Sequence, residues 1–212
     1  MIYMLKIVMT KGRIEEKTIE LLKKSGYDTS EFSDKGRKLL FTVKNAGIEI
    51  VLAKSADVIT YIEHGVCDIG IVGKDTIMEQ GKSFYEVLDL KFGKCRFALA
   101  GLKEKNFYEG YSQKIIATKY PNVAKRYFNE KGLDVEIVKI DGSVELAPIL
   151  GLSDGIVDIV ETGGTLFANG LAVYEEIAQI SARVIVNKAS IKLKKNEVDD
   201  FVGRISEYVE DI

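Results

Sequence analysis

Residues 156–163 (IVDIVETG) match, in pattern, residues 66–73 (VCDIGIVG), which lie 90 positions earlier in the chain. Two further pairs extend the match outward in the same order: residues 6–11 (KIVMTK) with 114–119 (KIIATK), and residues 48–51 (IEIV) with 135–138 (VEIV). Three ordered matches indicate an internal duplication, and therefore two lobes of similar βα fold. The second pair is offset by 87 residues and the KIVMTK pair by 108, so the first half carries about 20 extra residues, which we assign to residues 27–38.

Short β-branched runs alternate with amphipathic stretches along the whole chain, which is typical of an α/β protein. Strands are predicted at residues 5–9, 39–43, 48–52, 69–72, 97–102, 115–118, 135–140, 156–160 and 183–186. Helices are predicted after residues 10–13 and at residues 56–64, 122–131, 144–150 and 198–209. Ligands of open α/β sheets bind at the carboxyl ends of the strands, so the pattern predicts either a cleft enzyme or a two-lobed binding protein.

The composition excludes several kinds of chemistry. The 212 residues carry a net charge of −2, which gives no bulk field for nucleic acid or an anionic membrane, and no apolar run approaches the ~20 residues of a membrane helix. One histidine, His64, and two cysteines, Cys67 and Cys95, match no metal motif and make a Ser-His-Asp triad improbable. Without an export signal, these thiols suggest a reduced protein of the cytoplasm. We therefore expect chemistry based on carboxylates, cations and backbone amides.

The most informative candidate site is a strand-to-loop segment that ends in two acids and two glycines. It consists of Asp158, Glu161, Thr162, Gly163, Gly164, Thr165 and Leu166. Consecutive amides and threonine hydroxyls at such a turn can donate hydrogen bonds to a phosphate, and the preceding carboxylates suit a sugar diol. The segment therefore predicts a ligand with a phosphate and a ribose. A tight Gly-Gly turn with a capping threonine explains the same residues.

Several cations and one helix start are further candidates. Lys11 and Arg13 follow the first strand, where cations oppose the dipole of the next helix unless an anion is bound. Arg37 lies in the extra segment and Lys54 follows a strand; either can be a plain surface charge. Ser143 is predicted to cap a helix that could face the cleft, although capping alone accounts for it.

The stretch from Glu145 to Leu166 resembles, position by position, the signature of the ATP phosphoribosyltransferase family, the first enzymes of histidine biosynthesis. The matching positions are Glu145, Gly151, Ser153, Ile156, Asp158, Ile159, Thr162, Gly163, Thr165 and Leu166. Further segments resemble the same family at residues 11–13, 61–65, 68–70, 73–75, 92–96, 117–122 and 169–171.

This resemblance implies a two-lobed fold like the type II periplasmic binding proteins, with a cleft between two similar βα lobes. It implies condensation of ATP with phosphoribosyl pyrophosphate, with Mg²⁺ carried on the phosphates and no metal site of the protein's own. By the same resemblance, Asp158 and Glu161 hold the ribose hydroxyls and residues 162–166 the 5′-phosphate. Lys11, Arg37 and Lys54 act on the pyrophosphate and nucleotide, with weaker nucleotide assignments for Arg13 and Ser143.

One position departs from the family pattern. Residues 54–61 read KSADVITY where the family usually has Arg-Ala-x-Asp-Val-Pro-Thr-Tyr. The resemblance gives this position a bridging contact between ATP and pyrophosphate; Lys54 keeps the positive charge but lacks the planar bidentate fork of arginine that such a contact uses. Two rival classes are a non-enzymatic two-lobed binder of an anion and an orotate-type phosphoribosyltransferase.

The length adds expectations about domains and partners. We expect lobe I to comprise residues 1–91 plus 180–212, lobe II to comprise residues 92–179, and no C-terminal regulatory domain. The resemblance to the short form of the family implies a homo-oligomer that also assembles with a separate regulatory subunit similar to histidyl-tRNA synthetase.

Overall fold

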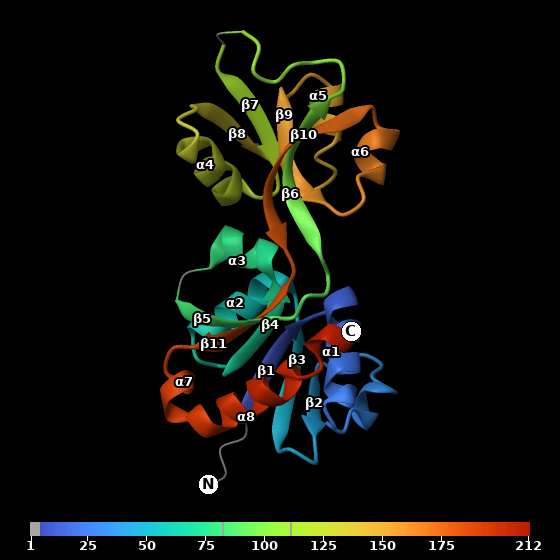
Figure 1. The fold of residues 1–212 in the computed structure, drawn as a ribbon, viewed down its shortest axis with the longest axis vertical. Helices are drawn as coiled ribbons and strands as arrows, with labels where there is room; N and C mark the ends of the chain where they lie inside the picture. Colours follow the sequence, from blue (N-terminus) through green and yellow to red (C-terminus); the bar gives the residue numbers. More distant parts are fainter. Residues whose placement is uncertain (1–4, 82, 111) are drawn as a thin grey trace. The chain divides into compact units, whose positions relative to one another are not determined.

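The computed structural model describes residues 5–81, 83–110 and 112–212. They divide into two compact units: the first comprises the chain up to Gly93 together with Ser181–Ile212, and the second comprises Lys94–Ile180. The predicted lobe boundaries differ from these by one or two residues. Each unit contains one mixed sheet with helices, so the prediction of two α/β lobes is confirmed (Figure 1).

The first unit is built on a six-stranded sheet with the order β2-β3-β1-β4-β11-β5. Its strands are β1 (Leu5–Thr10), β2 (Leu40–Val43), β3 (Ile48–Ala53), β4 (Ile69–Gly73), β5 (Phe84–Asp89) and β11 (Ala182–Asn187). Its helices are α1 (Arg13–Lys24), α2 (Ser55–Glu63), α3 (Lys74–Gln80), α7 (Ser190–Leu193) and α8 (Lys195–Ser206), with short 3-10 turns η1 (Ser30–Phe32) and η2 (Val209–Asp211).

Both faces of this sheet are covered by helices, and successive side chains of a strand point alternately into the two cores. On β1, Ile7 and Met9 belong to a core that includes side chains of α1 and α8, whereas Val8 belongs to a second core with side chains of α2. The C-terminal helix α8 packs against the first of these cores, in which its Val198, Phe201 and Ile205 are buried.

The second unit has a five-stranded sheet with the order β10-β6-β9-β7-β8. Its elements are β6 (Cys95–Leu102), β7 (Lys114–Thr118), α4 (Pro121–Glu130), β8 (Val135–Lys139), α5 (Leu146–Ile149), β9 (Gly155–Val160), α6 (Gly164–Ala168) and β10 (Leu171–Ile180).

The internal duplication is visible in the strand order. In the first unit β3, β1 and β4 run parallel and are followed by antiparallel β11; in the second, β8, β7 and β9 run parallel and are followed by antiparallel β6. The three repeated segments of the sequence are the three parallel strands of each unit. The additional residues of the first half form η1 and also β2, so the insertion extends beyond residues 27–38.

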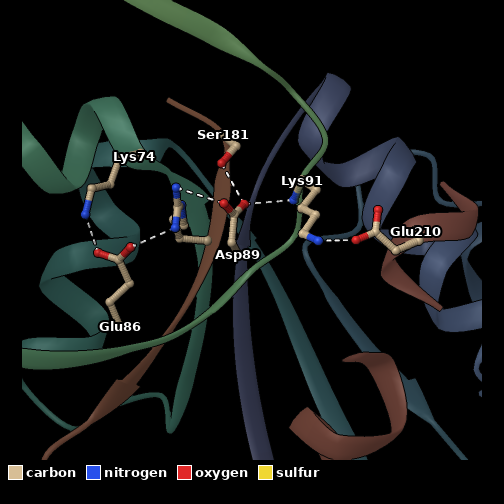
Figure 2. A network of polar contacts seen from close by, with 7 residues as sticks. Lys74, Glu86, Asp89, Lys91, Ser181 and Glu210 are labelled. Carbon is tan, nitrogen blue, oxygen red and sulfur yellow. Dashed lines mark hydrogen bonds and ion pairs between the residues drawn. The ribbon is translucent and has the colours of Figure 1, made fainter. Parts of the chain in front are cut away.

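Two connections link the units, at Gly93–Lys94 and at Ile180–Ser181. Beside them, Asp89 Oδ1 accepts hydrogen bonds from Ser181 Oγ (2.7 Å) and from the backbone N–H of Lys91 (2.9 Å) (Figure 2). The Lys91 ammonium pairs with Glu210, and Lys74 pairs with Glu86 at 2.5 Å. The backbone N–H of Leu90 also donates to the carbonyl of Ala182 at 2.9 Å. The two connections are therefore bonded to each other and to the C-terminal turn.

Candidate functional site

The glycine loop of the second unit follows directly from β9. Gly163 has a left-handed backbone (φ 82°) at the start of α6, a conformation that a residue with a Cβ adopts only with strain. The N–H of Phe167 donates to the Gly163 carbonyl at 3.0 Å, which begins the helical turn. Thr162 and Thr165 are exposed beside it. The N–H of Gly164 donates to Thr162 Oγ1 at 3.4 Å, a long hydrogen bond that an anion in the loop would replace. The loop therefore brings backbone amides and two exposed hydroxyls together, as an anion site requires.

Leu166 has a different place from the other loop residues. Its side chain is buried with Val160 and Leu171 in the core of the second unit. The predicted phosphate contact of Leu166 can involve only its backbone, while its side chain anchors α6 on the sheet. Glu161 is exposed at the mouth of the same loop, and its carbonyl accepts a hydrogen bond of 3.5 Å from Arg96 Nη1.

Asp158 lies in β9 on the face that is covered by α5. Ile156 and Val160, two residues before and after it, belong to the core that includes Val144 and Ala147, and every second residue of a strand points to the same face. Its partner on β6 is the small, buried Ala98. The pKa of the Asp158 carboxyl is raised to about 6, chiefly by burial and also by Glu145, while a backbone hydrogen bond at Ile159 and the charge of Lys119 act to lower it. This carboxylate is partly dehydrated and ready to accept hydrogen bonds.

The predicted cations of the first unit gather at one edge of its sheet. Lys11 follows β1 and Lys54 follows β3; the last residues of these parallel strands, Thr10 and Ala53, are partners, and the N–H of Lys11 donates to the Ala53 carbonyl at 3.0 Å. Arg37 precedes β2, which is antiparallel to β3, so it approaches the same edge. The structure thus brings the exposed Lys11, Arg37 and Lys54 to the carboxyl end of the sheet.

The start of α1 carries its own acid. Gly12 has a positive φ of 94°, and its N–H donates to Glu15 Oε2 at 3.2 Å. Glu15 is buried and pairs with Lys35 at 2.7 Å. Arg13, the first residue of α1, is exposed. A carboxylate in the first turn thus offsets the cations that the sequence places at this helix start.

The predicted cap at Ser143 is wrong. The helix α5 begins at Leu146, its cap position is Glu145, and no side chain caps it. Residues 144–145 form a turn instead: the N–H of Leu146 reaches the Ser143 carbonyl at 3.4 Å. Because α5 has only four residues, its N-terminus offers little for an anion, and any part that Ser143 plays depends on its own exposed hydroxyl.

Two charged residues that act on Asp158, Lys119 and Glu145, were not among the predicted site residues, although Glu145 is a position of the family signature. The signal was available, because Lys119 occupies the repeat position of Lys11. Cys67 is buried in the core, and burial raises the pKa of its thiol to about 11, which leaves it protonated. Within residues 5–81, 83–110 and 112–212, no group of three or more His, Cys, Asp or Glu side chains could hold a metal ion. No helix in that part of the chain is long and apolar enough to span a membrane.

The two units together define a duplicated α/β protein. One unit carries the glycine loop with Asp158 and Glu161, and the other carries the cations Lys11, Arg37 and Lys54. These are the features of a class of proteins that binds phosphorylated sugars. Residues 54–207 match the ATP phosphoribosyltransferase family. The chain belongs to this family, and it is a transferase of the pentosyl-transferring kind.

Curated relatives agree over nearly the whole chain. The ATP phosphoribosyltransferase of Clostridium kluyveri is 59% identical over 98% of this chain and 95% of its own length, and that of Clostridium acetobutylicum is 56% identical over 97% and 96%. A chain of the ATP phosphoribosyl transferase (HisG:HisZ) complex from Thermotoga maritima has a TM-score of 0.83 at 40% identity, covering 99% of this chain and 100% of that chain.

A putative L-cystine ABC transporter from Listeria monocytogenes shares the fold alone, with a TM-score of 0.59 at 14% identity over 99% of this chain and 92% of that chain. This similarity agrees with the predicted likeness to periplasmic binding proteins.

Proposed function

We propose that this chain joins N1 of the adenine of ATP to the anomeric carbon of phosphoribosyl pyrophosphate, giving phosphoribosyl-ATP and pyrophosphate, the first step of histidine biosynthesis. The observation that best supports it is the glycine loop between β9 and α6, directly after Asp158, in a chain of this family.

In the second unit, the amides of Gly163, Gly164 and Thr165 with the hydroxyls of Thr162 and Thr165 would donate hydrogen bonds to the 5′-phosphate, and the backbone of Leu166 completes the turn. Asp158 and Glu161 would accept hydrogen bonds from the ribose hydroxyls. This division follows from charge: amides and hydroxyls donate to a phosphate, whereas carboxylates would repel it and suit a diol.

In the first unit, Lys11, Arg37 and Lys54 would bind the pyrophosphate and the triphosphate. As adenine N1 forms its bond to the anomeric carbon, the bond to the pyrophosphate oxygen breaks and its electron pair leaves with the pyrophosphate. The chief requirement is therefore to position two polyanions and to stabilise the departing charge, which fixed cations do well. Arg13 and Ser143 are proposed, with less support, as contacts to the nucleotide.

Magnesium belongs to the substrate in this proposal. It would enter on the pyrophosphate of phosphoribosyl pyrophosphate, where it neutralises part of the charge that the lysines meet. Activity should therefore be lost on chelation by EDTA and restored when Mg²⁺ is added back.

We also propose that the chain forms a homo-oligomer and assembles with a regulatory subunit similar to histidyl-tRNA synthetase, acting in the cytoplasm. Support for the partner comes from the Thermotoga maritima chain, which is similar over its full length and was solved in a HisG:HisZ complex.

The decisive assay incubates the protein with ATP, Mg²⁺ and phosphoribosyl pyrophosphate and follows the ultraviolet absorbance of phosphoribosyl-ATP. It is run with and without the regulatory subunit, and with orotate in place of ATP. Product with ATP supports the proposal. Binding of both ligands without product, in the presence of the partner, would favour a non-enzymatic binder, and product with orotate would favour the other transferase class.

A further inference from the structure

The internal duplication places Lys119 in the second unit at the position that Lys11 occupies in the first. It follows β7 as Lys11 follows β1, in the repeated segments KIIATK and KIVMTK. Its side chain is exposed, and the neighbouring backbone is well fixed: Thr118 Oγ1 donates to the Val157 carbonyl at 2.6 Å and accepts from the N–H of Tyr120 at 2.9 Å. The ring of Tyr120 packs edge-on against Phe97 at 4.9 Å. Lys119 is therefore held at a defined point of the sheet edge.

This point is next to Asp158. β7 and β9 are parallel neighbours in which Thr118 lies opposite Val157. The next residues after these are Lys119 and Asp158, so these two residues lie opposite each other. Ala117 belongs to the core on the α5 face, and a side chain two residues later points the same way. Lys119 and Asp158 therefore share a face at the carboxyl edge.

Other charged groups approach the same face. Glu145, half-buried, precedes α5, which packs on β9 and β6. Arg96 of β6 is engaged with Glu176 at 2.9 Å, and Glu161 lies in the loop that follows β9; α6 contributes no titratable side chain. Burial has the largest effect on the Asp158 pKa, which it raises, and Glu145 acts in the same direction; a backbone hydrogen bond at Ile159 and the charge of Lys119 act in the opposite one, and Lys119 is the only side chain in the described part of the chain that does so.

We propose that Lys119 is a positioning residue of the ribose site: its ammonium stabilises the Asp158 carboxylate against burial and against Glu145, so that the carboxylate can accept hydrogen bonds from the sugar. The inference rests on the proposed function for the role of Asp158, whereas the charge balance itself belongs to the free protein.

The test compares Lys119→Gln, Lys119→Arg and Glu145→Gln in the full-length protein. The Asp158 carboxyl is titrated by carbon-13 NMR without ligand, assigned with Asp158→Asn. The acidic limb of kcat/KM for phosphoribosyl pyrophosphate is measured in parallel. Lys119→Gln should move both midpoints up by about 0.5 to 1 pH unit, the size expected for one partly solvated charge, and Glu145→Gln should move both down. Lys119→Arg should restore the original midpoint, and Lys105→Gln, an exposed lysine beyond the opposite end of β6, should leave it unchanged.

Midpoints that rise in Lys119→Gln and fall in Glu145→Gln support the inference, because a purely structural effect of the two substitutions would shift the midpoints in the same direction or not at all. An Asp158 midpoint unchanged in Lys119→Gln would overturn it. If the NMR midpoints move as expected but no phosphoribosyl-ATP forms with any variant or the wild type, the proposed function fails while the charge balance stands.

Discussion

Replacing Asp158 by asparagine should stabilise the free protein at neutral and alkaline pH. Folding raises the pKa of this carboxyl from 3.8 to about 6, so the unfolded chain ionises first as the pH rises. A pKa difference of about 2 units, at about 1.4 kcal/mol for each unit, lowers the free energy of unfolding by up to about 3 kcal/mol when the folded protein holds Asp158 ionised. The penalty is absent below pH 3.8, grows between pH 3.8 and 6, and is fully present above that range.

The measurement is urea unfolding of the wild type and Asp158→Asn at pH 5 and pH 8. The free energy of unfolding of the variant should exceed that of the wild type by up to about 3 kcal/mol at pH 8 and by roughly half as much at pH 5. Glu136→Gln, which removes an exposed carboxylate of β8, serves as control and should stay within about 0.5 kcal/mol at both values. In the same variant the affinity for phosphoribosyl pyrophosphate should fall. A stability difference that is equal at the two pH values would refute the reasoning.

Three further changes test other parts of the account. Lys11→Ala should lower kcat by about 10²-fold or more through loss of leaving-group stabilisation, and an unchanged kcat in steady-state kinetics would rule out that role. Gly163→Ala should destabilise the protein by about 1–2 kcal/mol because of its left-handed backbone and weaken phosphoribosyl pyrophosphate binding in calorimetry. The control Gly203→Ala, in the open interior of α8, should instead stabilise by about 0.5–1 kcal/mol. Asp89→Asn should weaken the bonding between the two connections and speed hydrogen exchange at the Leu90 and Ala182 amides; exchange at wild-type rates would contradict the role of Asp89.

Much of the fold could be predicted because most of the parallel strands, such as β1, β4 and β9, are largely buried. Such strands appear as short apolar runs, and the predicted bounds agree to within one residue for β1, β3, β4, β7, β8 and β9. Their duplication then predicted two lobes of similar fold, and the two sheets do share the order of their three parallel strands.

The strands β5 and β10 were missed for a physical reason. β5 is an edge strand whose Tyr85, Glu86 and Val87 are all exposed, and β10 contains two register irregularities with Glu175 and Glu176 between apolar residues. Neither therefore has a continuous apolar run or a regular alternation.

The candidate site was predictable where it depends on local chain chemistry and less so where it depends on packing. The loop at Gly163 follows from its glycines and threonines. The burial of the Leu166 side chain, the turn in place of a cap at Ser143, and the approach of Glu145 to Asp158 all depend on how α5 and α6 pack on the sheet, which sequence periodicity over four or five residues does not specify.

The most direct test of the central claim follows the bond that the proposed reaction makes. Adenine-labelled ¹⁵N-ATP and phosphoribosyl pyrophosphate labelled with ¹³C at the anomeric carbon are incubated with the protein, Mg²⁺ and the regulatory subunit, and the mixture is observed by NMR. We expect a new one-bond coupling between N1 of adenine and the labelled carbon, which appears with release of pyrophosphate and is lost in Lys11→Ala at equal incubation time. Unchanged ATP with intact or merely hydrolysed phosphoribosyl pyrophosphate would contradict it.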